Sequence, residues 1–359
     1  MFRLAISTGG GDAPGLNGVI RAIVLAAIHR GWEVHGIRKG FNGLLGEDAV
    51  VPLTADSVRG ITHLGGTILG TTNRGNPFNW PVANERGEIE MRDRSDELVA
   101  AFRRHGFDAM IVIGGDGSLR IAHALFKKGV PIVGVPKTID NDLAATDVTF
   151  GFRTAVQTAT EAIDKLHSTA ESHERTMVVE VMGRNTGWIA LFSGVSSTAD
   201  VILIPEIPYR LERVFDKIRE RYSSGRNFAI VVASEGAIPV GGEEIFQTET
   251  HSGVKRYGGI AEHLAGEIAE HTGVETRSLV LGHLQRGGTP TAYDRLIALR
   301  FGAAAVRMVE AGRFGTMVAL HPPEVRAVPI EEAIAQIKRV PVGGDIVQTA
   351  RDMGIAFGD

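Results

Sequence analysis

The sequence contains no cysteine among its 359 residues. This absence excludes disulfide bonds, thiolate metal sites and a cysteine nucleophile, and it favours a reducing, cytoplasmic compartment. Positive charge is not in excess either, because 38 lysines and arginines stand against 42 aspartates and glutamates, for a formal net charge of −4. A general affinity for nucleic acid is therefore not expected, and any anionic substrate must be held by local groups of arginine.

Long apolar segments are also missing from the sequence. The amino terminus has no basic region followed by a long apolar one, so we expect neither a signal peptide nor a membrane span. Hydrophobic residues make up 43% and charged residues 22% of the chain, which is typical of a globular protein. A chain of 359 residues is long enough for two domains with a large core.

The most informative stretch runs from Gly114 to Asp142. The run 108–113, apolar after Asp108, shows no polar alternation, which predicts a strand buried on both faces of a parallel sheet. It leads directly into Gly-Gly-Asp-Gly-Ser at 114–118. A second apolar run, 130–135, leads into Pro-Lys-Thr-Ile-Asp-Asn-Asp at 136–142. Because parallel strands end at one edge of a sheet, both motifs should meet where open α/β folds bind ligands.

The residue types of the first motif suit a polyphosphate. Gly114, Gly115 and Gly117 would let backbone N–H groups approach phosphate oxygens, and Ser118 would open a helix whose positive end favours anions. Asp116 would sit among these donors, where a carboxylate requires a cation such as Mg²⁺ between it and the phosphate. Taken alone, the motif would more often be an ordinary tight turn than a phosphate site.

The second motif supplies carboxylates. Asp140 and Asp142 offer what a kinase also needs, a base that takes the proton from an attacking hydroxyl. An Asp-Asn-Asp cluster alone would more often cap a helix or close a turn. Finding both motifs after consecutive buried strands favours the functional interpretation, because two turns at the same sheet edge must converge in space.

Other segments carry further candidates with open alternatives. The apolar run 4–7 leads through the glycine-rich residues 8–17 into a helical pattern, which is a second phosphate cradle or only a strand-to-helix turn. A later glycine-rich loop carries Arg74, which could fold over a phosphate tail or lie exposed on the surface. His283 and Arg286 follow a short strand and could bind a phosphate monoester or form salt bridges between domains.

Strands and helices continue to alternate after the second motif. The strands expected at 177–182 and 228–233 would present Met182, Gly183 and Arg184 at one end and Glu235 beside them. This alternation predicts an α/β fold, and because no linker separates its halves we expect them to pack closely, with the site in the cleft between them.

Together these segments resemble the 6-phosphofructokinase family, from Gly9 to about Lys338. The resemblance rests on the motifs GGGDAPGLN, GGDGS, PKTIDND, VMGR and GHLQRGGTPTAYDR. It implies transfer of a phosphoryl group from MgATP to the 1-hydroxyl of fructose 6-phosphate, giving fructose 1,6-bisphosphate and ADP in glycolysis. It also implies a fold of two Rossmann-like three-layer α/β lobes with the active site in the cleft between them. The donor lobe would comprise residues 1–151 and about 285–336, and the sugar-phosphate lobe residues 152–284 and about 337–359.

The resemblance assigns roles on the donor side. Asp140 would be the base, and Thr138 and the backbone of Gly11 would hold the transferring phosphoryl group. Asp116 would engage Mg²⁺, the only cofactor implied, and Arg74 would contact the donor phosphates. The loop around Arg74 is one residue longer than in the best-known bacterial members.

The resemblance assigns roles on the acceptor side as well. Arg184 would meet the charge that develops during transfer. The residues that would hold the sugar and its 6-phosphate are Met182, Gly183, Glu235, His283 and Arg286, beside Thr138, Asp140 and Asp142. In the family, residues matching Arg175 and Arg277 reach that phosphate from a neighbouring subunit, so a homodimer or homotetramer with shared active sites is implied.

Two positions bear on the phosphoryl donor and disagree. Gly117 matches ATP users, whereas pyrophosphate users commonly have aspartate there; Lys137 matches pyrophosphate users, whereas many bacterial ATP enzymes have glycine there. An aspartate at 117 would place bulk and negative charge where the nucleotide must pass. A lysine at 137 is a flexible cation that attracts the phosphates of either donor. We therefore expect ATP as the main donor, with pyrophosphate weak or inactive.

Three alternatives to an ATP-dependent kinase are open. A pyrophosphate-dependent phosphotransferase is the nearest. A dinucleotide-binding oxidoreductase is disfavoured because no G-x-G-x-x-G follows a strand with an acidic residue about twenty positions on. A non-catalytic subunit that binds sugar phosphate would have no need of Asp140.

The regulatory nucleotide site of bacterial members of the family is rich in arginine and lysine. Here Arg21 is present, but Leu25 and His167 stand at two positions where those members have basic residues. This difference argues against control by ADP or phosphoenolpyruvate.

Overall fold

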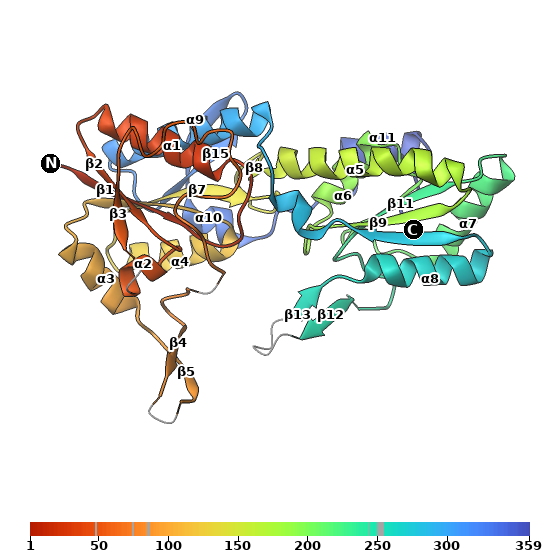
Figure 1. Cartoon of the computed structure of the whole chain (residues 1–359), viewed down its shortest axis with the longest axis horizontal. Helices are drawn as coiled ribbons and strands as arrows, with labels where there is room; N and C mark the ends of the chain where they lie inside the picture. The colour runs from red at the N-terminus through yellow and green to blue at the C-terminus, as the bar shows by residue number, and fades with distance from the viewer. Residues whose placement is uncertain (47–48, 74, 85–86, 244, 250–254) are drawn as a thin grey trace. The chain divides into compact units, whose positions relative to one another are not determined.

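The chain folds as two compact units, each built from two segments (Figure 1). The computed structural model describes residues 1–46, 49–73, 75–84, 87–243, 245–249 and 255–359. The first unit comprises Met1–Arg153 and Arg286–Ile337, and the second comprises Thr154–Gln285 and Lys338–Asp359. The chain therefore passes from one unit to the other after Arg153, after Gln285 and after Ile337.

A mixed sheet forms the centre of the first unit. Its strands, in spatial order, are β16 (Glu324–Pro329), β15 (Thr316–His321), β7 (Ile132–Thr138), β6 (Ala109–Gly114), β1 (Arg3–Thr8), β2 (Glu33–Ile37) and β3 (Val50–Leu53), with the short β8 (Phe150–Gly151) paired to β7. The inner strands are parallel, and β3 and β16 are antiparallel edges. All of β6 is buried, which confirms the strand predicted from its unbroken apolar run.

Helices cover both faces of this sheet, as Figure 1 shows. One face carries α1 (Leu16–Ile28) and α9 (Ala292–Glu310), and the other carries α2 (Asn42–Leu45), α3 (Ser95–Arg104), α4 (Asp116–Lys127) and α10 (Ile330–Ala335). Helices α1 and α9 approach closely because Gly302 has no side chain: a Cβ there would lie 2.6 Å from the carbonyl oxygen of Val19. The predicted three-layer α/β arrangement is confirmed for this unit.

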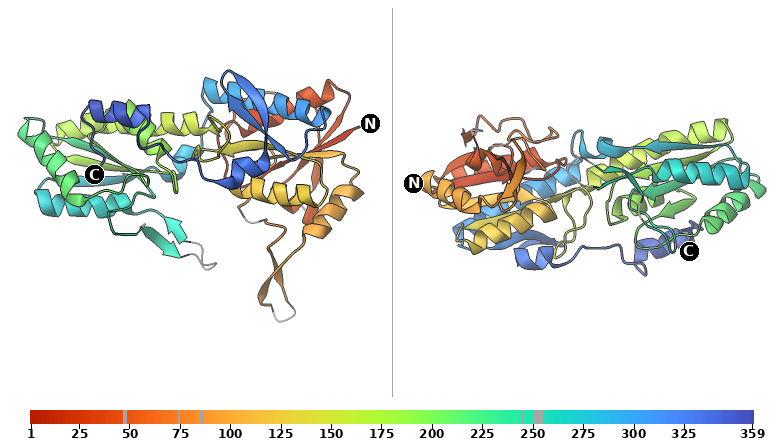
Figure 2. Two further views of the ribbon diagram at one scale, coloured as in Figure 1. Left: turned by 180° about the vertical axis from the view of Figure 1, so that it is seen from behind. Right: turned by 90° about the horizontal axis from the view of Figure 1, so that it is seen from below.

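The second unit repeats the plan with a smaller, wholly parallel sheet. Its strands, in spatial order, are β10 (Val201–Leu203), β11 (Ala229–Ser234), β9 (Thr176–Val181) and β14 (Thr276–Val280). Helices α7 (Leu211–Ser223) and α8 (Ile260–Thr272) pack their apolar sides on one face of this sheet. Helices α5 (Phe152–Ser172), α6 (Trp188–Ser196) and α11 (Asp345–Asp352) lie on the other (Figure 2).

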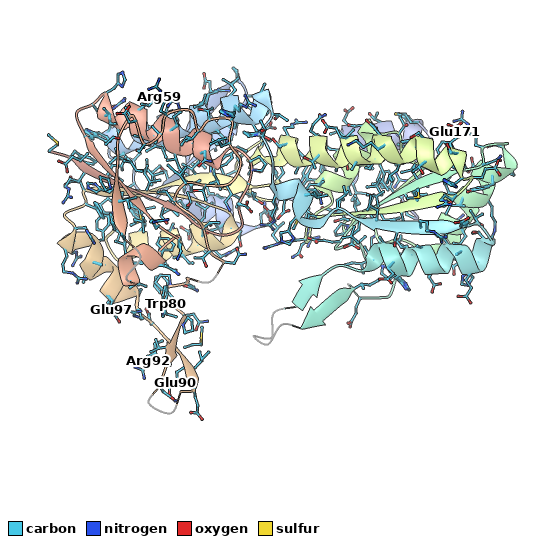
Figure 3. The ribbon with its side chains drawn as sticks, viewed as in Figure 1. Arg59, Trp80, Glu90, Arg92, Glu97 and Glu171 are labelled. Atoms are coloured by element: carbon cyan, nitrogen blue, oxygen red, sulfur yellow. The ribbon has the colours of Figure 1, made fainter. Side chains whose placement is uncertain are left out.

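Two antiparallel ribbons that the sequence did not predict complete the chain. In the first unit, β4 (Trp80–Ala83) and β5 (Ile89–Arg92) form a hairpin that projects from the unit (Figure 3). Glu90 and Arg92 pair on it at 3.0 Å, and the Arg94 guanidinium lies 5.6 Å from the ring of Trp80. In the second unit, β12 (Phe246–Glu249) pairs with β13 (Lys255–Tyr257). Across the described ranges, every helix is too short or too polar to cross a lipid bilayer.

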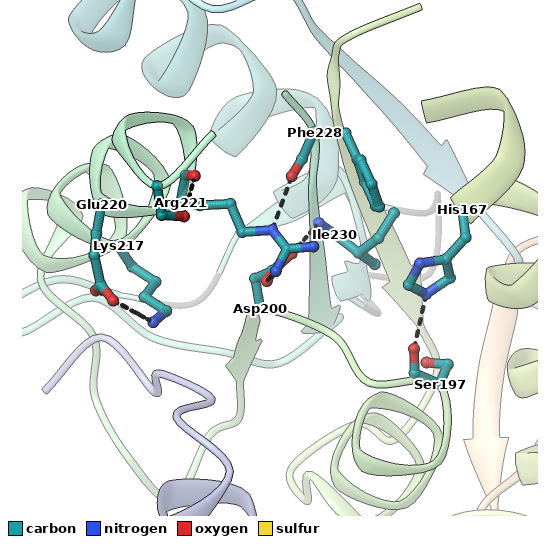
Figure 4. A network of polar contacts seen from close by, with 9 residues as sticks. His167, Ser197, Asp200, Lys217, Glu220, Arg221, Phe228 and Ile230 are labelled. Atoms are coloured by element: carbon teal, nitrogen blue, oxygen red, sulfur yellow. Dashed lines mark hydrogen bonds and ion pairs between the residues drawn. The ribbon is translucent and has the colours of Figure 1, made fainter. Parts of the chain in front are cut away.

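A buried ion pair holds α7 against the sheet of the second unit (Figure 4). Asp200, which precedes β10, is only 7% exposed; its Oδ1 lies 2.9 Å from Nη1 of Arg221, and its Oδ2 accepts the N–H of Ile230 at 2.9 Å. Arg221 also donates from Nε to the carbonyl of Phe228 at 3.0 Å. Burial raises the pKa of the Asp200 carboxyl, although the Ile230 N–H and the Arg221 charge act in the opposite direction.

We expect Asp200→Asn to lower the free energy of unfolding by about 3 kcal/mol, because it leaves the partly buried guanidinium of Arg221 without its carboxylate. The matched control is Glu220→Gln, whose ion pair with Lys217 leaves the carboxylate exposed (Figure 4) and is worth about 0–1 kcal/mol. Urea denaturation of the two variants and the parent measures the difference. Equal losses in both variants would show that Asp200 contributes no more than a surface pair.

The raised pKa of Asp200 also determines how this group makes the free energy of unfolding depend on pH. As the pH rises, the unfolded carboxyl ionises first, near its usual value of 3.8, and the folded carboxyl ionises later. The folded state therefore binds more protons in this window, and this group lowers the free energy of unfolding until the pH passes its folded pKa. Asp200→Asn should remove this part of the pH dependence.

Candidate active site

The carboxyl ends of β1, β6 and β7 bring the predicted glycine turns and carboxylates of the first unit together. These three strands are adjacent and parallel, with Thr8 paired to Ile113 and Gly114 to Pro136. The N–H of Gly9, in the first glycine turn, donates to the carbonyl of Ile113 at 3.0 Å. The convergence of residues 114–118 and 136–142 expected from two buried strands is therefore present, and the turn at residues 9–11 lies beside them.

Ser118 packs between the glycine turns and does not open a helix. Helix α4 begins two residues earlier, at Asp116, so the predicted start at Ser118 was wrong. An acidic first residue is favourable there because it meets the positive end of the helix. A Cβ on Gly9 would lie 2.7 Å from Ser118 Oγ, and a Cβ on Gly114 would overlap the Ser118 side chain. Gly117 differs, since a Cβ there would meet no atom within 4 Å.

The first glycine turn is fastened to the loop that carries Arg74. The N–H of Gly10 donates to the carbonyl of Thr72 at 3.1 Å, and the hydroxyl of Thr71 donates to the carbonyl of Gly10 at 2.5 Å. Arg74 itself lies outside the described residues. Thr71 was not singled out from the sequence, because a hydroxyl that contacts a distant carbonyl leaves no local pattern.

Two cations border Gly11. A Cβ on Gly11 would overlap the guanidinium of Arg286, so glycine is required for this close approach. Lys137 donates from Nζ to the Gly11 carbonyl and is only 3% exposed. The prediction that Lys137 is a flexible cation is therefore wrong, because β7 buries its side chain and the glycine turn fixes its ammonium group.

The second motif turns sharply after β7. The backbone N–H of Asp140 donates to the hydroxyl oxygen of Thr138 at 3.1 Å, and the Asp140 side chain is 5% exposed. Asn141 adopts a left-handed conformation with φ of 52°, and Asp142 is partly buried. The turn thus places Asp140 beside Thr138, which are two of the three residues to which catalysis was assigned from the resemblance; Arg184 is the third.

Asp116 suits a cation that is shared with a phosphate. Its carboxylate is 40% exposed and lies 3.0 Å from Nε of Arg120 on the same helix. Within the described part of the chain, no three acidic or histidine side chains gather into a metal-binding group. A single carboxylate at a helix N-terminus does not form a complete metal cage, but it fits Mg²⁺, which commonly takes one or two carboxylates plus phosphate oxygens and water.

The second unit gathers its candidates at the carboxyl edge of its own sheet. Met182, Gly183 and Arg184 follow β9, between Glu235 after β11 and His283 after β14. The N–H of Arg184 donates to Oε1 of Glu235 at 3.0 Å, so these two predicted residues are in contact. Arg184 has a φ of 49° and an exposed side chain, whereas Met182 is buried.

His283 lies in a short 3₁₀ helix, η1 (Gly282–Arg286), and is exposed. Strand β14 ends at Val280, so it does not deliver His283 directly into a glycine turn as predicted. Arg286 closes this 3₁₀ helix and is the first residue of the segment that returns to the first unit. The two side chains named as a phosphate clasp therefore belong to different units.

Arg175 and Arg277 lie at the opposite edge of the second sheet. Arg175 precedes β9, and Arg277 is the second residue of β14. Both reach Oε1 of Glu275, at 3.2 Å and 2.8 Å. A strand of this length spans roughly 20 Å, so these arginines are far from Met182 at the other end of β9. Glu275 was not named from the sequence, where a lone glutamate gives no signal.

Comparison with known proteins agrees with this geometry. The family model described as Phosphofructokinase matches residues 3–309. The ATP-dependent 6-phosphofructokinase of Chloroflexus aurantiacus is 51% identical over 357 residues, which cover 99% of this chain and 98% of that protein. The pyrophosphate–fructose 6-phosphate 1-phosphotransferase of Amycolatopsis methanolica is 51% identical over 344 residues, which cover 95% of this chain and 96% of that protein.

A solved structure extends the likeness to three dimensions. The structure of Pichia pastoris phosphofructokinase in the T-state is 31% identical in sequence, with a TM-score of 0.80, and the match covers 99% of this chain and 37% of that chain. The match to the family model, the identity of about half to full-length relatives and this shared fold all point the same way. The chain belongs to the phosphofructokinase family.

Proposed function

We propose that this chain transfers the terminal phosphoryl group of ATP to the 1-hydroxyl of fructose 6-phosphate, giving fructose 1,6-bisphosphate and ADP as a step of glycolysis. One observation carries the proposal: two glycine turns, Asp116 and the buried Asp140 meet at one edge of the first sheet. Such an edge offers a phosphate cradle, a cation ligand and a base together. The name of the Chloroflexus relative supports ATP as the donor.

The two units receive different substrates in this proposal. The first unit holds the donor through its glycine turns, and the second holds the sugar through the residues that follow β9 and β11. In particular, Glu235 binds a sugar hydroxyl while it fixes the backbone of Arg184, to whose N–H it is bonded. Arg286, at Gly11, supplies positive charge for the 6-phosphate, and His283 supplies a ring nitrogen that can hydrogen-bond to it.

A divalent metal ion is implied by membership of an ATP-dependent kinase family, and we propose that Asp116 holds it as Mg²⁺. Bound there with the donor, the ion would neutralise charge on the phosphate oxygens. Replacing the contact between Asp116 and Arg120 with a contact to the metal ion costs little free energy, because both side chains are exposed to solvent. Asp116 is therefore available to a nucleotide-borne cation.

The proton moves to Asp140 in the proposed reaction. The carboxylate takes the proton of the sugar 1-hydroxyl while the hydroxyl oxygen forms its bond to the terminal phosphorus and the bond from phosphorus to the ADP oxygen breaks. Thr138 keeps Asp140 in place through its hydroxyl, which accepts the Asp140 N–H. The buried ammonium group of Lys137 adds positive charge beside the first glycine turn.

A pyrophosphate-dependent reaction is the second candidate, favoured by Lys137 and by the name of the Amycolatopsis relative. Parallel assays with ATP and with pyrophosphate separate the two. We expect ADP to form in equal amount to fructose 1,6-bisphosphate and only in the presence of fructose 6-phosphate. Turnover with pyrophosphate and none with ATP would overturn the ATP proposal; no sugar-dependent product with either donor would overturn the kinase itself.

We also propose a homodimer or homotetramer in which Arg175 and Arg277 complete the site of a neighbouring subunit. The placement of both arginines at the amino edge of the second sheet supports this, since Met182 and Glu235 lie at its carboxyl edge. Their shared contact with Glu275 keeps the two guanidinium groups close together, as binding of one phosphate would require.

Mixing two inactive preparations tests the shared site. One carries Arg277→Ala and the other Asp140→Asn, so after subunit exchange some sites contain both intact residues. We expect part of the parental activity to return. In a mixed oligomer, some sites take Asp140 from the Arg277→Ala subunit and Arg277 from the Asp140→Asn subunit. The control mixes two preparations that both carry Asp140→Asn and should stay inactive. Demonstrated subunit exchange with no return of activity would contradict a shared site.

A further inference from the structure

The turn that carries Asp140 depends on a residue to which no role has been assigned. Asn141 stands between two aspartates in a left-handed conformation, with φ of 52°, and it is buried. Asparagine is one of the few residues with a side chain that adopt this conformation readily. Its Oδ1 accepts the backbone N–H of Thr149 at 3.2 Å, so the turn is bonded to a segment eight residues further along the chain.

Thr149 completes this link from the other side. Its hydroxyl donates to the backbone carbonyl of Thr138 at 2.8 Å, and its side chain is fully buried. The residues that follow continue the pairing as β8, with Phe150 opposite Lys137 and Gly151 opposite Thr138. The stretch from Thr138 to Asn141 is thus held at both ends by one residue, and Asp140 lies between the two attachment points.

The same segment contacts the first glycine turn. A Cβ on Gly151 would lie 2.8 Å from Cβ of Ala13 and 3.4 Å from Cγ2 of Ile139, and a Cβ on Gly15 would lie 2.9 Å from the ring of Phe150. Residues 149–151 therefore lie between the exit of the donor turn and the turn that carries Asp140. Glycine backbone packed this closely against Ala13, Ile139 and Phe150 cannot move far without disturbing both turns.

We infer that Asn141 and Thr149 are positioning residues for phosphoryl transfer: they hold Asp140 at a fixed distance from the donor turn. This inference rests on the proposed function, in which Asp140 is the base. A base works only within hydrogen-bond reach of the hydroxyl proton, and an error of about 1 Å can lower the rate about 10²-fold. Neither residue needs to touch a substrate for this effect.

Substitutions at Asn141 separate its two properties. Asn141→Gly keeps the left-handed backbone and removes the amide, so we expect kcat to fall about 10-fold to 10²-fold while KM for both substrates stays within about twofold. Asn141→Asp keeps the acceptor oxygen and adds a charge between Asp140 and Asp142. It should keep most of kcat, because the link to the N–H of Thr149 remains.

Substitutions at Thr149 provide a matched pair. Thr149→Val keeps the branched shape and removes the hydroxyl donor, and we expect kcat to fall about 10-fold or more. Thr149→Ser restores the hydroxyl and should return kcat to within about threefold of the parent. A purely structural role would instead lower the melting temperature of all four variants without a split between kcat and KM. Melting curves recorded for each variant therefore accompany the kinetics.

The outcomes distinguish this inference from the proposal on which it rests. Parental kcat in Asn141→Gly and Thr149→Val, together with a full loss in Asp140→Asn, would overturn the positioning roles and leave the base assignment standing. Parental turnover in Asp140→Asn would overturn both. A rise in KM for fructose 6-phosphate with unchanged kcat would make Asn141 a binding residue and would also overturn the inference.

Discussion

Asp140→Asn is expected to lower kcat by about 10²-fold to 10⁴-fold and to leave the binding of fructose 6-phosphate almost unchanged. The amide has nearly the shape of the carboxylate but cannot accept the hydroxyl proton, and general-base catalysis contributes a factor of this size. The substituted side chain occupies the same buried place beside Thr138. Single-turnover rates and calorimetric titration with fructose 6-phosphate measure the two effects separately.

The control for Asp140→Asn is Asp147→Asn, in the exposed part of the same loop. It removes one negative charge at a similar place in the sequence and should keep kcat within about twofold, since surface charges act weakly at a distance. If Asp140→Asn turns over within a few-fold of the parent, Asp140 is not the base. If both variants lose activity equally, the loss reflects the net charge of the loop and not proton transfer.

Gly117→Asp should abolish turnover with ATP, the second large effect that we expect. A Cβ at residue 117 would meet no protein atom within 4 Å, so the turn accepts a larger side chain without strain. An aspartate in the first turn of α4 is also favourable for the helix. The new carboxylate would instead point its bulk and charge toward the path of the nucleotide, where it repels the α-phosphate. ADP formation under saturating fructose 6-phosphate measures the loss.

Two further substitutions at residue 117 separate the effect of side-chain size on ATP turnover from the effect of its charge. Gly117→Asn has the size of aspartate without its charge, and Gly117→Ala has little of either. We expect Gly117→Ala to keep most ATP turnover and Gly117→Asn to lie between alanine and aspartate. ATP turnover by Gly117→Asp at the parental rate would contradict the exclusion of ATP by an aspartate at this position. The choice between ATP and pyrophosphate would then have to depend on the surroundings of Lys137.

The frame of the site could be predicted because buried parallel strands have an unmistakable sequence pattern. Residues 109–113 contain no polar side chain, and such a run fits the centre of a sheet covered on both faces. Once two such strands were recognised, the turns after them had to share an edge. The edge strands escaped prediction for the opposite reason: β3 contains a proline, β5 alternates charged with apolar residues, and both are only four residues long.

The contacts within the site could not be predicted, since they join residues far apart in the chain. Nothing near Lys137 in the sequence indicates that its ammonium group meets the carbonyl of Gly11. Ser118 likewise has the sequence context of a helix start, and only the close passage of Gly9 and Gly114 shows that it fills space between two turns. Such pairings depend on the register of neighbouring strands, which local patterns leave open.

Because the chain passes between the units three times, the first unit is completed only late in synthesis on the ribosome. Helix α9 covers α1 and supports β7, yet it emerges only after all of residues 154–285 have been synthesised. A nascent chain that ends at Arg153 exposes the face of α1 that α9 covers, and it lacks β15, the parallel neighbour of β7. Residues 1–153 therefore remain incompletely packed while residues 154–285 are translated. During this interval their exposed apolar surface is open to aggregation.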